Sequence, residues 1–266
     1  MAKLDELRRH YHKQICAEVI FKKVGGIPSM ADVANKLSRD VSQNLLNLLP
    51  YPVSNTEISG QTAGERLEGI TKDFLEKAFS YLQHVRPGSW TFSVHNSISD
   101  FDQYRHLSEL AQLIAENRAL KTALGDYVIS PDIVVARHPI SDAEINKIQP
   151  LIGTNGPPQY TPLRAHTNSA LLLHAIISCK WTLRSDRSQN ARTEALNLIR
   201  NRKGHTPHIA VVTGEPVPTR ISSLALGTGD IDCVYHFALP ELLQAIRQTN
   251  DETALETLVH VGVNDE

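Results

Sequence analysis

Two carboxylates and one lysine in this sequence have the residue types that divalent-metal phosphodiester hydrolysis requires. Asp132 opens a short apolar run, Lys180 closes another, and Glu194 follows in a stretch with helical spacing. Side chains alternate along a strand, so Ser178 and Lys180 should project from one face, where an Asp at the end of a neighbouring strand can reach them. A helix that returns over the sheet can bring Glu194 to the same point. We therefore treat these residues as a candidate active site.

The chemistry expected of this group follows from its ligand types. Asp132 and Glu194 would give oxygen ligands to Mg²⁺, which offsets phosphate charge and lowers the pKa of a bound water. Lys180 would orient or help deprotonate the attacking water and stabilise the developing charge. Glu68, in a further helical stretch, is either an additional metal ligand or an ordinary exposed glutamate. Singly, Asp132 also fits a turn, Lys180 a solvated strand end, and Glu194 a helix-surface ion pair.

A basic segment surrounds two of these residues. From Ser178 to His205 there are seven Lys and Arg against two acidic residues, a local charge of +5 within a chain of net charge −2. The rest of the chain therefore carries −7. A basic stripe in an otherwise acidic protein is typical of a surface that binds a polyanion, although a solvated helix face has the same composition.

The basic segment contains the cluster Arg184-Ser185-Asp186-Arg187 directly after the lysine-bearing strand. Arginine forks can donate paired hydrogen bonds to guanine, and an aspartate can accept one from cytosine. An acidic side chain facing DNA is otherwise repelled by phosphate, so Asp186 between two arginines favours base reading. The alternative is an Asp favoured by the dipole at a helix N-terminus.

The elements that must position these residues follow from hydrophobic periodicity. Helices are expected over residues 3–20, 30–49, 62–83 and 99–120, and a crossover helix over 186–203. Thr62 with Glu65 and Ser141 with Glu144 have the spacing of a capping box. Short β-branched or apolar runs at 127–129, 133–135, 171–181, 208–213 and 232–237 predict strands of a mostly buried sheet. The sequence thus predicts one α/β domain over residues 1–266, with helical N-terminal additions.

Composition excludes other classes. The chain has 266 residues, 41% of them hydrophobic, which is enough for a buried core. No apolar run approaches the roughly 20 residues of a membrane span, and the charged N-terminus does not resemble a secretory signal. Three unclustered cysteines form no disulfide framework. We expect a cytoplasmic protein with no membrane partner. Cys233-x-x-His236 and His205-x-x-His208 have zinc-compatible spacings, but such residues are common in cores and on surfaces.

Several segments together resemble the NgoMIV family of type IIF restriction endonucleases, which cut CCGG-containing sites. The longest runs from Ser178 to Glu194 and continues from Asn201 to Gly204. Further similar segments are Gly60 to Thr62, Leu82 to His84, Ile221 to Gly229 and Asp232 to Phe237. The resemblance covers roughly residues 56–245 and implies a restriction-endonuclease-like PD-(D/E)XK core, with a central mixed sheet flanked by helices.

The resemblance also implies roles for individual residues. In this family Ser replaces the acid two positions before the catalytic lysine, and the missing acid comes from the next helix. Ser178 and Glu194 match that substitution, so Asp132, Lys180 and Glu194 would form the catalytic core, with Glu68 as an accessory acid and metal ligand. The family comparison assigns Arg184, Asp186 and Arg187 to the central CCGG.

The outer base pairs would be read elsewhere. Gln61 and Arg220 resemble the family's outer contacts, while Ala34 falls where a relative has a polar contact. The expected site is GCCGGC on double-stranded DNA, cut with Mg²⁺ after the first base to leave four-base overhangs with 5′-phosphates. A palindrome requires at least a homodimer, and the resemblance implies a homotetramer.

Two other functions remain open from the residues. A repair or defence nuclease of the same fold would prefer a DNA structure over a sequence. A non-catalytic, specific DNA-binding protein would bind DNA without cutting it, although the presence of Asp132, Lys180 and Glu194 speaks against that alternative.

Overall fold

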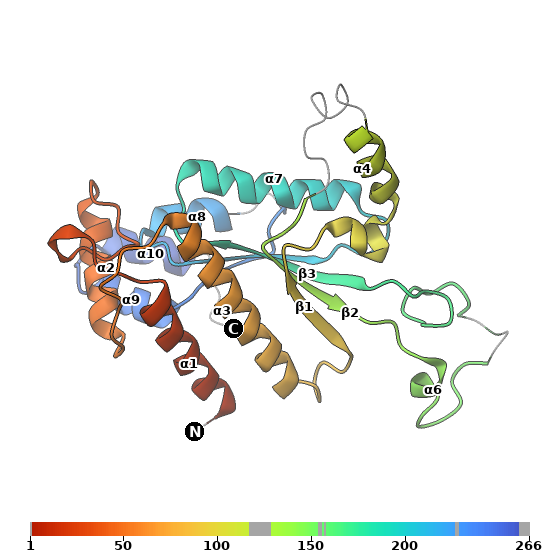
Figure 1. The fold of residues 1–266 in the computed structure, drawn as a ribbon. Coiled ribbons are helices and arrows are strands. Elements are labelled where there is room, and N and C mark those ends of the chain that lie inside the picture. The colour runs from red at the N-terminus through yellow and green to blue at the C-terminus, as the bar shows by residue number, and fades with distance from the viewer. Residues whose placement is uncertain (1, 117–128, 154–155, 157, 227–228, 261–266) are drawn as a thin grey trace. The chain divides into compact units, whose positions relative to one another are not determined.

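The computed structural model describes residues 2–116, 129–153, 156, 158–226 and 229–260. Five strands form one sheet in the order β1 (Trp90–Val94), β2 (Ile133–Arg137), β3 (Leu172–Lys180), β4 (His208–Thr213) and β5 (Cys233–His236) (Figure 1). β1 pairs with β2 in antiparallel fashion and β4 pairs with β5 in parallel. The sheet is therefore mixed, which confirms the predicted α/β class.

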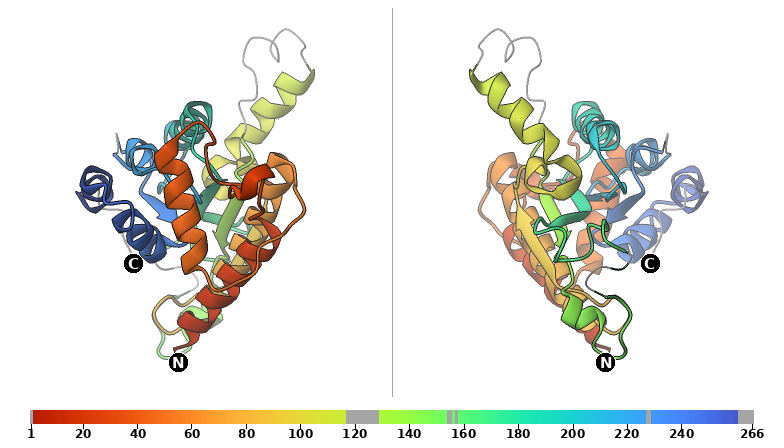
Figure 2. Two further views of the ribbon diagram at one scale, coloured as in Figure 1. Left: turned by 90° about the vertical axis from the view of Figure 1, so that its left-hand side faces the viewer. Right: turned by 90° about the vertical axis from the view of Figure 1, so that its right-hand side faces the viewer.

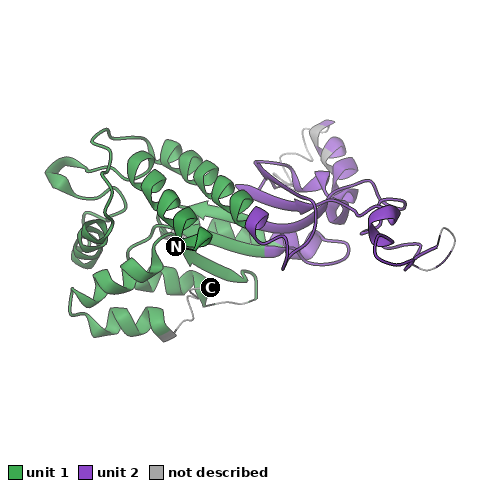
Figure 3. Cartoon of the chain, turned by 90° about the horizontal axis from the view of Figure 1, so that it is seen from below, with its two compact units in different colours: residues 1–78, 177–196, 209–266 green, residues 79–176, 197–208 purple. Residues whose placement is uncertain are grey.

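The chain divides into two compact units, each built from several segments (Figure 3). Unit 1 comprises residues 1–78, 177–196 and 209–266, and unit 2 comprises residues 79–176 and 197–208. The prediction of a single domain over residues 1–266 stays a prediction. In the described part of the chain, no helix has the length and apolar character that crossing a membrane requires.

Unit 1 holds most of the helices. They are α1 (Lys3–Glu18), α2 (Lys36–Leu48), the 3-10 helix η1 (Val24–Gly26), most of α3 (Gly60–Tyr81), most of α7 (Ser185–Asn201), α8 (Pro218–Ala225), α9 (Leu239–Arg247) and α10 (Glu252–His260). Unit 2 holds the 3-10 helices η2 (Ile98–Asp100) and η3 (Asp102–Tyr104), with α4 (His106–Glu116) and α6 (Asp142–Ile145).

The core of unit 1 is tied together by buried polar contacts as well as apolar packing. α1 and α3 lie side by side (Figures 1 and 2), and the hydroxyl groups of Tyr11 and Thr71 are 3.0 Å apart. Nε2 of His12 lies 2.9 Å from the carbonyl oxygen of Phe237. α2 packs against α9, and the Asn44 amide donates to the Ala245 carbonyl. These contacts fix α1 against α3 and Phe237, and α2 against α9.

Unit 2 contains a loop organised by one arginine. The Arg164 side chain is 1% exposed and donates to both carboxylate oxygens of Asp142, each at 2.6 Å. It also donates to the carbonyl oxygens of Gly153 and Pro158. A buried guanidinium needs such partners to offset its lost hydration. Arg164 therefore ties Gly153 and Pro158 to Asp142 in α6.

Several predicted boundaries were wrong. The second helix begins at Lys36, not residue 30, because Asn35 caps it by accepting from the Ser38 amide. The third helix begins at Gly60, not at residue 62. Its capping residue is Ser59, whose hydroxyl accepts a hydrogen bond from the backbone amide of Thr62.

The helix expected over 99–120 is instead two short 3-10 turns followed by α4. Residues 127 and 128 of one expected strand lie outside the described residues. Ser141 does cap α6, which is only 4 residues long. β1 and the three C-terminal helices were not predicted.

Candidate active site

The end of β3 and the middle of α7 bring together two of the predicted residues within unit 1. Ser178 is buried and its Oγ donates a hydrogen bond of 3.0 Å to Oε2 of Glu194. Lys180 lies two residues further along β3, so its side chain leaves the same face of the strand as Ser178. The carboxylate supplied by α7 thus stands beside the serine position, as the sequence predicts.

α7 holds Glu194 in place because its neighbouring small and apolar residues are buried. Ala191 and Ala195 are 3% and 0% exposed, and Leu198 is 0% exposed. This spacing of four and three residues puts them on one helical face. Glu194 lies at the border of that face, half-buried, which leaves its carboxylate able to meet both Ser178 and a ligand.

Glu68 lies in α3 and is only 9% exposed, so its interpretation as an ordinary exposed glutamate was wrong. Its Oε1 packs over Gly64, one turn earlier, where a Cβ atom would come within 3.9 Å of it. A carboxylate buried to this extent needs hydrogen-bond or ionic partners to offset its lost hydration.

Asp132 belongs to unit 2 and directly precedes β2. Its backbone carbonyl accepts a hydrogen bond of 3.3 Å from the amide of His95, which fixes the chain at the point where the strand begins. The residue therefore occupies the strand-end position that the sequence predicts for it.

The residues predicted to read DNA in unit 1 come from three segments, namely the start of α3, the start of α7 and the start of α8. Arg184, Asp186 and Gln61 are exposed, and Gln61 donates to Glu65 at 3.0 Å. Arg187 donates to the Thr182 hydroxyl at 2.9 Å, and its Nη2 passes within 3.9 Å of where a Cβ atom on Gly60 would lie. Arg187, which is predicted to read the central CCGG, therefore lies beside the start of the helix that carries Gln61.

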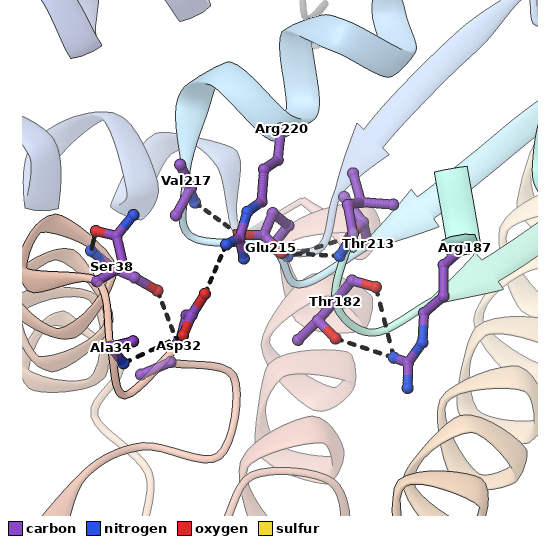
Figure 4. Close-up of polar contacts among 12 residues, drawn as sticks. Asp32, Ala34, Ser38, Thr182, Arg187, Thr213, Glu215, Val217 and Arg220 are labelled. Atoms are coloured by element: carbon purple, nitrogen blue, oxygen red, sulfur yellow. Dashed lines mark hydrogen bonds and ion pairs between the residues drawn. The ribbon is translucent and has the colours of Figure 1, made fainter. Parts of the chain in front are cut away.

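Arg220 lies at the start of α8 between two carboxylates (Figure 4). Its Nη2 donates to Oδ2 of Asp32 at 2.6 Å, and its Nη1 lies 3.5 Å from Oε1 of the buried Glu215. The arginine holds the pKa of Asp32 below its usual range, and the charge of Arg184 adds to that effect. Asp32 is thus an acidic residue beside Arg220, and the sequence analysis did not single it out.

Ala34 is exposed, and its amide donates to Oδ1 of Asp32 at 3.2 Å. Its role is to cap the Asp32 carboxylate through the backbone. Glu215 was missed as well, although a lone acid in the apolar run from Val211 to Val217 is a signal of a buried, partnered carboxylate.

Part of the basic segment serves the protein itself. Arg192 donates to both oxygens of the buried Asp230 carboxylate at 2.9 and 3.0 Å. Its other nitrogen donates to the carbonyl oxygens of Ser223, Leu224 and Leu226. Arg192 therefore fastens α7 to the end of α8, and the stripe is not uniformly available to a polyanion.

Comparison with known proteins identifies the family of this chain. The family model described as NgoMIV restriction enzyme matches residues 11–265. The chain belongs to the NgoMIV restriction enzyme family. It is 48% identical over 264 residues to the type II restriction enzyme NgoMIV of Neisseria gonorrhoeae, covering 97% of this chain and 92% of that protein.

Membership of the NgoMIV family makes the chain a restriction endonuclease, a site-specific enzyme with DNA as its substrate. Enzymes of this class generally use divalent metal ions. Among the described residues, no three His, Cys, Asp or Glu side chains form a ready-made metal cluster.

Proposed function

We propose that this chain is a Mg²⁺-dependent type II restriction endonuclease that cleaves both strands of GCCGGC after the first base. The products would carry four-base overhangs with 5′-phosphates. The hydrogen bond from Ser178 to Glu194 carries the proposal. It puts a carboxylate beside the strand position that an acid occupies in the usual D…(D/E)-x-K nuclease pattern, two residues before Lys180.

The proposed metal ligands are Asp132 and Glu194, with Glu68 as an accessory. Their oxygen atoms are the hard ligands that Mg²⁺ prefers. When bound, the ion would supply charge neutralisation at the scissile phosphate and a more acidic water.

The protein's own groups have separate tasks in this proposal. The Ser178 hydroxyl donates to Oε2 of Glu194, and in this proposal it fixes the rotamer of Glu194 so that the other carboxylate oxygen would bind the ligand. Lys180, on the same face of β3, orients the attacking water and offers a positive charge to the phosphate oxygens as they gain charge. This division explains why the serine position carries a neutral donor, because a second acid there would repel Glu194.

Recognition of the central CCGG is assigned to Arg184, Asp186 and Arg187. They lie at the N-terminal end of α7, immediately after the catalytic strand, so a shift on binding is passed to the cleavage site through a few residues. Arginine donors suit guanine O6 and N7, and the aspartate suits cytosine N4. Gln61 and Arg220 are assigned to the outer pairs, and the carboxylate of Asp32 beside Arg220 adds an acceptor there.

A two-fold palindrome requires two equivalent active sites, so the proposal includes at least a homodimer. A homotetramer that holds two DNA sites would cut a plasmid with two copies faster than a plasmid with one.

The test is a digest of plasmids with one and with two GCCGGC sites, in Mg²⁺ and in EDTA, followed by sequencing of the ends. We expect Mg²⁺-dependent cutting after the first base, and no cutting by Lys180→Ala. Cutting at another CCGG-containing site would overturn the assignment of the outer pairs. Binding without cutting in Mg²⁺ or Mn²⁺ would overturn the proposed catalysis.

A further inference from the structure

A fully buried carboxylate lies between two of the segments assigned to DNA reading. Glu215 follows β4 and is 0% exposed. Its Oε2 accepts a hydrogen bond of 2.8 Å from the Leu183 amide, and its Oε1 accepts one of 3.2 Å from the Val217 amide (Figure 4). The Glu215 amide in turn donates to the Thr213 hydroxyl at 3.1 Å. The side chain is thus held at both oxygens by backbone.

The same carboxylate faces the outer-pair reader. Arg220 Nη1 lies 3.5 Å from Glu215 Oε1, while Nη2 donates to Asp32. Burial raises the pKa of Glu215, and the Leu183 amide and the Arg220 charge oppose that rise. A buried carboxylate with this few partners is sensitive to the position of each one, because loss of any of them leaves charge without compensation.

The other end of the contact is the inner-pair reader. Leu183 immediately precedes Arg184, and Thr182 accepts the hydrogen bond of Arg187. The start of the segment 182–187 is therefore bound to Glu215 through the Leu183 amide. Its end is bound to its start through the hydrogen bond from Arg187 to Thr182. A displacement of the Glu215 carboxylate moves the Leu183 amide and, with it, the base of the Arg184 side chain.

We propose that Glu215 is a positioning residue that couples recognition of the outer base pairs to recognition of the central CCGG. The proposal rests on the proposed function, since it takes Arg184, Arg187 and Arg220 as the readers. When Arg220 engages an outer guanine, its second contact with Glu215 adjusts the carboxylate that holds Leu183. Such coupling is reciprocal, so an incorrect inner pair must also weaken discrimination at the outer pair.

The test measures binding in Ca²⁺, without cleavage, to four duplexes built on the cleaved site. They are the site itself, the site with its outer pair changed, the site with one inner pair changed, and the site with both changes. For the wild-type protein the two penalties should be non-additive. In Glu215→Gln they should become additive, with discrimination at the outer pair reduced about tenfold.

The matched control is Glu241→Gln. Glu241, in α9 of the same unit, also pairs with an arginine, because Arg8 of α1 lies 2.7 Å from it. This variant makes the same chemical change without touching a reading segment, so the wild-type coupling should persist. Melting temperatures of both variants separate lost stability from lost coupling.

A second variant keeps the proposal falsifiable if Glu215→Gln does not fold. Arg220→Ala changes a partly exposed side chain and should lower discrimination at the inner pair as well as at the outer pair. Unchanged inner discrimination in Arg220→Ala, or wild-type coupling in Glu215→Gln, would overturn the role of Glu215. Equal binding of all four duplexes by the wild-type protein would instead contradict the proposed recognition, and this proposal with it.

Discussion

The hydroxyl of Ser178 in β3 donates to the carboxylate of Glu194 in α7, 3.0 Å away, across 16 residues of sequence. The contact joins a residue near the end of the strand β3 to the middle of the helix that follows it. Through it, an acid that is remote in sequence is fixed beside the strand that carries Lys180. The relationship gives the serine a positioning role that can be measured apart from catalysis.

Ser178→Ala removes this hydrogen bond and leaves Glu194 free to change rotamer. We expect kcat to fall about tenfold, because a hydrogen bond to a charged group is worth on the order of 1.5–3 kcal/mol and part of it is lost in the transition state. DNA affinity in Ca²⁺ should stay unchanged. Single-turnover cleavage rates check this, with Ser108→Ala, whose exposed hydroxyl donates to the Arg105 carbonyl, as the control. An unchanged rate would show that other contacts hold Glu194.

Lys180→Ala and Asp132→Ala should each lower cleavage by about 100-fold or more, because each removes a group that acts on the reacting phosphate. Specific binding in Ca²⁺ should largely remain for both. Gel shifts and cleavage rates on the same duplex separate the two effects. If both variants cut at the wild-type rate, the active site lies elsewhere.

Arg187→Ala should weaken binding to the specific site by about 1–3 kcal/mol, since it removes one set of base contacts. Arg192→Ala provides the comparison five residues further along α7. Arg192 is bound to Asp230 and to α8 carbonyls, so its loss should lower stability and leave discrimination at CCGG intact. Binding titrations of both variants with a CCGG duplex and with a substituted duplex measure this discrimination. Full discrimination in Arg187→Ala would reject base reading by this residue.

Gly214→Ala should destabilise the protein by about 1–3 kcal/mol through overpacking. A Cβ atom on Gly214 would lie 2.4–2.8 Å from three ring atoms of Trp181, whose ring is buried. The Gly214 amide also donates to the Trp181 carbonyl, so the backbone cannot retreat without losing that bond. Urea unfolding measures the loss. The double variant with Trp181→Leu should recover part of the stability, and no recovery would contradict the steric cause.

Stability should decline as the pH falls from about 6.5 to about 4, partly because of His236. Burial lowers the pKa of His236 to about 4. The unfolded chain therefore binds a proton before the folded chain does, so stability is fully present above the unfolded pKa and is lost as the pH falls toward the folded one. The maximum loss is about 3 kcal/mol.

His236→Asn removes this titration, and its unfolding free energy should vary less with pH than that of the wild type. A slope remains in the variant because burial also lowers the pKa of His12. Equal slopes in the two proteins, from guanidinium titrations between pH 7.5 and 4.5, would contradict the assignment.

Local patterns predicted the part of the fold that local forces decide. Apolar runs gave the strands at 133–135, 171–181 and 208–213 to within a few residues. The strand Trp90–Val94 was missed although its aromatic and polar residues alternate with period two. The start of α2 was predicted too early, because the hydrophobic pattern extends into the irregular segment that precedes the helix. The helix itself begins after its N-cap, Asn35.

The site was predictable where its residues lie close in sequence or follow one strand and its next helix. Ser178 and Glu194 meet because a crossover helix must return over the sheet. Asp32 and Arg220 meet across 188 residues, and no periodicity or capping signal specifies that contact. Asp32 escaped the sequence analysis for this reason, because only tertiary packing brings it to the arginine.

In unit 2, several contacts of one loop depend on the single side chain of Arg164. Its guanidinium reaches Asp142 and two loop carbonyls at once, so the closed arrangement depends on a single side chain. Lysine has no planar fork and could not take its place. Replacing Arg164 would therefore release several contacts of this segment at once, and limited proteolysis would detect the change as new cleavage there.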